Sequence, residues 1–109
     1  MAKTKEGYVH VGDVLRDALV DDIDAIAWDG DMRARADKVK ASLQLAAPHR
    51  GGYLVDTSGW SQDDVDFLRM EVDSVHEDEG HSFMSHGIRL GNTRIGRQIL
   101  ALRTRLDEL

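Results

Sequence analysis

The chain has 109 residues, of which 41% are apolar and 6% aromatic, a composition typical of one globular domain with a core of aliphatic side chains. It contains no cysteine, which excludes disulfides, thiolate metal sites and a cysteine nucleophile. Its net charge of −6 disfavours nucleic-acid binding, and no run approaches the ~20 apolar residues that a membrane span needs.

The N-terminal part predicts a short strand followed by a helix. Met1–Glu6 is too polar for a secretory signal, so we expect a protein made in the cytoplasm. Residues 7–11 alternate weakly between apolar and polar types, which favours a strand before a turn at Gly12. From Asp13, which can cap a helix, apolar residues recur at spacings of three and four as far as Ala27.

A second helix and a strand follow. Gly30 interrupts the first apolar pattern, and a new apolar stripe runs from Met32 to Ala46. This helix is expected to end before Pro48, because proline disfavours a helical residue ahead of it. Residues 53–55 then read as a strand that leads into a turn at 57–59.

The region 66–90 predicts a β-hairpin. Residues 66–76 show the cleanest alternation in the chain, with Leu68, Met70 and Val72 on one face and charged residues on the other. This pattern indicates a half-buried strand. Residues 77–80 are typical of a turn, and 81–90 read as a second strand with a bulge at Gly87.

The chain is expected to end in a helix capped by Asn92 or Thr93. We therefore predict one α+β domain over residues 1–109, in which two N-terminal helices and a C-terminal helix pack on a small antiparallel β-meander. The absence of βαβ alternation and of a glycine fingerprint excludes a nucleotide-binding Rossmann or P-loop fold. The apolar stripe of the last helix comprises Ile95, Ile99, Leu102, Leu106 and Leu109.

Charged residues occur in blocks of alternating sign. Residues 13–31 hold seven acids against one base, residues 56–79 hold nine acids against one base, and residues 89–105 hold five arginines and no acid. Such blocks are compatible with ion pairs inside the fold, with solvated faces, or with complementary surfaces on neighbouring subunits.

One cluster has the residue types for metal chemistry. His76, His81 and His86 are five residues apart, and three carboxylates separate the first two. On the predicted strands His76 and His81 flank a turn, whereas His86 lies on the order of 17 Å further along. We interpret the cluster as an acidic, solvated turn and expect no catalytic, cofactor or dedicated metal site; adventitious metal on His76 and His81 stays open.

The junction between the second helix and the strand carries a recognisable motif. Residues 47–54 read Ala-Pro-His-Arg-Gly-Gly-Tyr-Leu, which resembles the A-P-x-x-T-G-x-L signature of phage head-tail joining proteins, also called neck or tail-completion proteins. In this alignment Ala47 opens the motif, Pro48 ends the helix, Gly52 takes the turn and Leu54 starts the strand. Gly51 stands where the signature has threonine.

The resemblance implies a non-enzymatic virion protein that forms a homo-oligomeric ring at the head-tail junction. Its implied partners are a portal-side adaptor or stopper on one side and a tail tube or terminator protein on the other, with no membrane or sequence-specific nucleic acid. The charge blocks then suggest that acids of one subunit meet arginines of the next. The candidate interface residues are Asp73, Glu77, Asp78, Glu79, Arg89, Arg94 and Arg97.

Two alternative functions belong to other classes of protein. An acidic chain of this size is compatible with a small cytoplasmic regulatory or adaptor protein that mimics the charge of nucleic acid. A metal-dependent hydrolase at the histidine cluster is the other alternative. A tight complex with a host nucleic-acid enzyme would favour the first, and stoichiometric metal that depends on His76 and His81 would favour the second.

Overall fold

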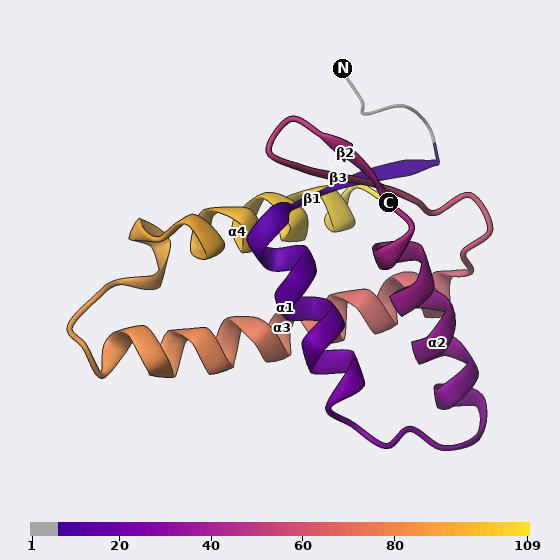
Figure 1. Cartoon of the computed structure of the whole chain (residues 1–109), viewed down its shortest axis with the longest axis horizontal. Helices are drawn as coiled ribbons and strands as arrows, with labels where there is room; N and C mark the ends of the chain where they lie inside the picture. The colour runs from indigo at the N-terminus through magenta and orange to yellow at the C-terminus, as the bar shows by residue number, and fades with distance from the viewer. Residues whose placement is uncertain (1–6) are drawn as a thin grey trace.

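The computed structural model describes residues 7–109, within which it has three strands, four α-helices and one 3-10 turn (Figure 1). The prediction for Met1–Glu6 lies outside these residues. In chain order the elements are β1 (Tyr8–Gly12), α1 (Asp13–Asp24), α2 (Gly30–Gln44), β2 (Ala47–His49), β3 (Gly52–Asp56), α3 (Gln62–Met84), the 3-10 turn η1 (Leu90–Asn92) and α4 (Arg94–Asp107).

The strands form one antiparallel sheet in the order β1-β3-β2. Val9 pairs with Val55, and both are fully buried together with Val11, on strands that contact α1 and α4. The predicted α+β class is confirmed, as are the strands expected at residues 7–11 and 53–55. Helices α1 and α2 are inserted between β1 and the β2–β3 hairpin.

Helix α1 contacts each of the other three helices and the sheet (Figure 1). Its buried residues, Leu15, Leu19 and Ile23, are spaced by four, so one stripe of the helix faces the core. The predicted stripe is confirmed, but α1 ends at Asp24, and Ile26 beyond it is 45% exposed.

Helix α3 occupies the region predicted as a β-hairpin. The strand expected at 66–76 and the turn expected at 77–80 lie inside α3, and 81–90 forms its last turn, a connection and the start of η1; these three predictions are wrong. The helix starts at a capping box, in which Ser61 Oγ accepts from the Asp64 N–H and Asp64 Oδ2 accepts from the Ser61 N–H at 2.9 Å.

The spacing of buried residues explains why a helix forms here. The alternation of Leu68, Met70 and Val72 matches the period of a strand over only five residues. Apolar residues spaced by three and four, which match the period of a helix, extend over the whole buried part of α3. In the helix Met70 is 45% exposed, while Leu68 and Val72 are fully buried. The repeat consists of Val65, Leu68, Val72 and Val75.

Helix α4 completes the core by packing against β1, α1 and α3. Thr93 caps it, because its hydroxyl accepts from the Gly96 N–H at 3.0 Å, and this confirms one of the two predicted caps. The buried residues of α4 follow the predicted stripe, except that Leu109 is 47% exposed. The buried apolar residues of all these elements form one cluster.

Candidate interaction surface

The motif at residues 47–54 forms the β2–β3 hairpin. Helix α2 ends at Gln44, before Pro48 as predicted, and Pro48 lies in β2. His49 pairs with Gly52, so the turn consists of Arg50 and Gly51, whose φ angles of 45° and 77° are those of a primed two-residue turn. The prediction that Gly52 takes the turn is therefore wrong by one residue.

Gly52 is instead the first residue of β3, and Leu54 lies in the middle of that strand opposite Ala47, not at its start. A Cβ atom on Gly52 would lie 2.3 Å from the Val11 carbonyl oxygen of β1. The glycine is thus required by the close approach of two strands. All three residues of β2 are exposed, so the hairpin presents an uncovered edge.

Two of the predicted interface residues are engaged within the chain. Asp73 of α3 pairs with Arg103 of α4 at 2.8 Å. Arg94 pairs with Asp13 at the start of α1, also at 2.8 Å. A hydrogen bond from Gln98, together with those from the Val14 N–H and Arg94, holds the pKa of Asp13 below its usual value. The charge blocks therefore hold α3 and α1 against α4, which is the first of the three alternatives left open by the sequence.

The other five predicted interface residues form no ion pair within residues 7–109. Glu77, Asp78 and Glu79 lie on the last third of α3, and Arg89 lies in the connection to α4. Arg97 is exposed and donates only to the Asn92 carbonyl oxygen, at 3.2 Å. These side chains are free to meet charges of another molecule.

These free charges lie on a region that we call the arm, residues 76–100, whose α4 part also contributes the buried Ile95 and Ile99 to the core. No residue of α3 beyond Val75 is buried, and of the last nine residues of the helix only Phe83, half-buried, packs against the core. In Figure 1 this end of α3 and the start of α4 reach past α1 and meet in a connection at one extremity of the molecule. The outermost segment, residues 85–89, is called the tip.

The arm also exposes large apolar side chains. Met84 is 76% exposed, Leu100 66% and Ile88 45%. The backbone at the tip is nevertheless defined by hydrogen bonds, since the Ile88 N–H donates to the Phe83 carbonyl oxygen at 2.9 Å. An ordered extension with exposed apolar residues and unpaired charges is typical of a protein-protein interaction surface.

Comparisons with protein-family models, curated proteins and solved structures find no match to this chain. Within residues 7–109, no helix combines the length and the apolar character needed to cross a membrane. The function is therefore inferred from the residues of the chain itself.

The histidine cluster lies on the arm, but not in the predicted geometry. His76 and His81 are both on α3, so they do not flank a turn, and His86 follows the helix, where its Nδ1 atom lies 3.0 Å from the Ser82 carbonyl oxygen. Among the described residues, no three His, Cys, Asp or Glu side chains are placed together to hold a metal ion.

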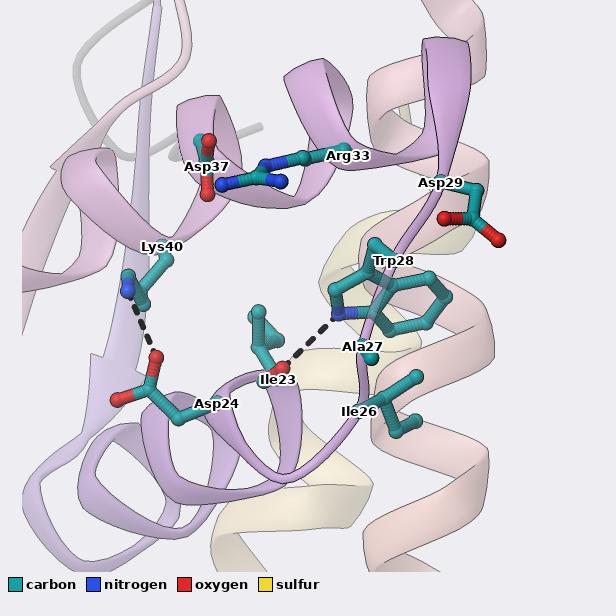
Figure 2. Close-up of a pocket in the computed structure, with 9 residues that line it drawn as sticks. All are labelled: Ile23, Asp24, Ile26, Ala27, Trp28, Asp29, Arg33, Asp37 and Lys40. Atoms are coloured by element: carbon teal, nitrogen blue, oxygen red, sulfur yellow. Dashed lines mark hydrogen bonds and ion pairs between the residues drawn. The ribbon is translucent and has the colours of Figure 1, made fainter.

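A second surface feature was not anticipated from the sequence. Where α1 ends and α2 begins, a pocket of about 370 Å³ opens beside Trp28; we call it the α1–α2 pocket (Figure 2). The Trp28 indole N–H donates to the Ile23 carbonyl oxygen at 2.9 Å, and its ring packs edge-on against Phe67 of α3, with ring centroids 5.1 Å apart. Trp28 is therefore a fixed, half-buried wall of the pocket.

The rim of the α1–α2 pocket is charged. Lys40 pairs with Asp24 at 2.7 Å, and this hydrogen bond is the main reason that the pKa of Lys40 is raised. Asp29, Arg33 and Asp37 are exposed and form no ion pair with the described residues (Figure 2). A tryptophan flanked by aspartates in the break between two helices is the only sequence signal that could have indicated this site.

Proposed function

We propose that this protein is a structural component of the head-tail junction of a long-tailed phage, where it assembles into a ring in the virion. It acts by binding other protein chains and not by catalysis, and it needs no cofactor. The observation that carries the proposal is the arm, which exposes Met84, Ile88 and Leu100 beside charges of both signs that have no partner within residues 7–109.

The arm supports assembly because its exposed groups do little for the monomer. The buried side chains of α3 end at Val75, and beyond that point only the half-buried Phe83 packs against the core, beside the free charges. Apolar side chains that stay in water gain free energy only when another surface covers them, at roughly 25 cal/mol per Å². Acids and arginines around such a patch favour one orientation of the partner.

The β2–β3 hairpin supports the assignment to the head-tail junction. It carries the residues that resemble the joining-protein signature, and these residues form an edge strand, a tight turn and a strand paired with β1, directly after the end of α2. The proposed partners are further copies of the chain, a portal-side adaptor or stopper, and a tail tube or terminator protein.

Electron microscopy tests the proposal directly. The protein is examined alone and mixed with candidate portal and tail-tube proteins, and purified virions are analysed by mass spectrometry. We expect a ring at one end of the partner assembly and the chain in every virion. Virions that lack the chain, together with no ring in any mixture, would overturn the proposal, and a tight complex with a nucleic-acid enzyme would favour the regulatory alternative.

Substitutions on the arm connect the test to the structure. Replacing Met84 and Leu100 by aspartate is expected to abolish ring formation while leaving the thermal unfolding temperature within a few degrees of the wild type, because both side chains are exposed. Leu45→Asp is the matched control, since Leu45 is 84% exposed but lies outside the arm. The control variant is expected to assemble like the wild type.

A further inference from the structure

We propose that the tip of one copy docks into the α1–α2 pocket of the next, with Ile88 against Trp28 and Arg89 between Asp29 and Asp37. This contact rests on the proposed function, because it names the interface through which the ring would form. The ligand of the α1–α2 pocket is then a second copy of this chain.

The position of the two features in the fold suits such a contact. The tip lies at one extremity of the molecule, and the connection between α1 and α2 lies along its lower edge in this view, away from the tip (Figure 1). A contact between two different surfaces is heterologous, and it repeats from copy to copy until the rotation closes it into a ring. A single self-complementary patch would stop at a dimer.

The charges of the two surfaces are complementary. Residues 80–93, which include the tip, contain no acid, and Arg89 has no ion pair within residues 7–109. The pocket has three carboxylates, Asp24, Asp29 and Asp37, against Arg33 and Lys40. Lys40 already neutralises Asp24. The remaining carboxylates outnumber the remaining cation, so the pocket attracts a further guanidinium.

The apolar parts are also compatible. Ile23, Ile26, Ala27 and Trp28 line the pocket, and its volume of about 370 Å³ is within the ~300–1,000 Å³ of typical ligand sites. Ile88 is 45% exposed at the tip. An aliphatic side chain on an immobile indole, with an arginine beside it, is the combination that dominates many protein interfaces. The Arg89 guanidinium can also stack on the indole face.

A mixing experiment distinguishes this contact from any symmetric one. The double variant I88A/R89A removes a competent tip without adding a charge but keeps the pocket, whereas the double variant D29R/D37R removes the pocket but keeps the tip. All four side chains are exposed, so folding should be unaffected. By sedimentation velocity, each variant alone should lose self-association at least tenfold, and an equimolar mixture should form a one-to-one dimer and nothing larger.

The matched control is Asp66→Arg, which reverses an exposed acid of α3 that lines neither feature. It should self-associate like the wild type. If I88A/R89A and D29R/D37R both assemble like the wild type, the proposed contact is wrong, while the ring itself stands. If virions and mixtures show no ring but the two variants still form their dimer, the contact stands and the proposed function fails.

Cysteine trapping decides the question even where self-association is too weak to sediment. The chain has no cysteine of its own, so a chain with I88C and A27C carries only the two introduced thiols. Under oxidation at high concentration it should give a ladder of disulfide-linked oligomers. The control pair I88C and Q62C places the second thiol at the start of α3 and should give no ladder. Absence of a ladder from I88C/A27C overturns the contact.

Discussion

The carboxyl groups of Glu71 on α3 and Asp22 on α1 face each other in the interior between the two helices. Glu71 is only 2% exposed, and its Oε1 atom and Asp22 Oδ2 are buried without a hydrogen-bond donor among the described residues. Burial, and then the charge of Asp22, raises the pKa of Glu71 to about 7. Protonated Glu71 donates a hydrogen bond to Asp22, so the pair holds one proton below that pH.

The first prediction is that the protein loses stability as the pH rises through neutrality. The pKa of Glu71 is raised in the folded state, so its stabilising contribution is complete below the ordinary value of 4.5 and is lost as the pH rises through about 7. The expected loss is on the order of 2 to 3 kcal/mol. Urea unfolding between pH 5 and pH 9 measures it.

Glu71→Gln keeps the hydrogen bond to Asp22 and cannot ionise, so this variant should be the more stable protein at pH 8 and should show no loss through neutrality. Asp22→Asn removes the neighbouring charge but not the burial, so its loss of stability should move to lower pH and persist. An unchanged profile for Glu71→Gln would show that another group titrates.

The second prediction concerns Asp64, which joins α2 to the start of α3. Its carboxylate is 3% exposed, pairs with Lys38 at 2.5 Å and Arg35 at 3.3 Å, and caps α3. Burial acts to raise its pKa, but the hydrogen bonds from Lys38 and Ser61 outweigh burial and lower it. Its contribution to stability is therefore present at neutral pH and lost as the pH falls below its ordinary value.

Asp64→Ala should lower the free energy of unfolding at pH 7 by about 2 to 4 kcal/mol, because it removes half of the capping box, the carboxylate partner of Lys38 and the shorter of the two ion pairs of Arg35. Asp63→Ala is the control: Asp63 is exposed, and its ion pair with Arg35 is 3.6 Å long, so the loss should stay below about 1 kcal/mol. Equal losses in the two variants would mean that the buried network contributes nothing beyond surface charge.

The sequence was sufficient to predict a helix where the apolar residues followed a single, helical spacing. The stripe of Leu15, Leu19 and Ile23 predicted α1, although its N-cap is Gly12 and not Asp13, and an apolar stripe preceded by Asn92 or Thr93 as the cap predicted α4. In α3 two patterns competed. The alternation around Met70 was shorter than the helical repeat from Val65 to Val75, and only the burial of the repeat against α1 and α4 decides between them.

The interaction surface was predictable only in part. Exposed acids and arginines were anticipated, but the sequence cannot show that Asp73 lies against Arg103 or that Glu79 does not reach a base, since both depend on how α3 and α4 cross. The α1–α2 pocket depends likewise on Trp28 lying over Phe67, a contact between residues 39 positions apart. The sequence shows which residues are charged, but the packing of the helices determines which of these charges have no ion-pair partner within the chain.

The third prediction tests the hairpin motif. Gly52→Ala places a methyl carbon 2.3 Å from the Val11 carbonyl oxygen, which is too close for two non-bonded atoms, so β3 must move away from β1. We expect a loss of about 2 kcal/mol or more in urea unfolding, as for other overpacked sites. Gly59→Ala is the control, because nothing lies within 4 Å of the added atom. A Gly52→Ala protein as stable as the control would show that the sheet accommodates the methyl group.

The fourth prediction concerns the base of the arm. Gly96 of α4 is buried against η1, where a Cβ atom would lie 1.8 Å from the Leu90 carbonyl oxygen. Gly96→Ala must therefore push η1 off α4 and shift the tip, which is joined to η1. Hydrogen exchange should accelerate in residues 85–93, and ring assembly should weaken more than tenfold.

Gly91→Ala provides the comparison, because Gly91 is exposed within the same 3-10 turn and has no atom within 4 Å of an added Cβ. It should leave both exchange and assembly unchanged. If Gly96→Ala accelerates exchange in the arm but assembles normally, the geometry of the arm does not govern assembly, and the interface must be sought on the uncovered edge of β2. If Gly96→Ala weakens ring assembly without any change in hydrogen exchange of residues 85–93, the substitution does not act by displacing η1.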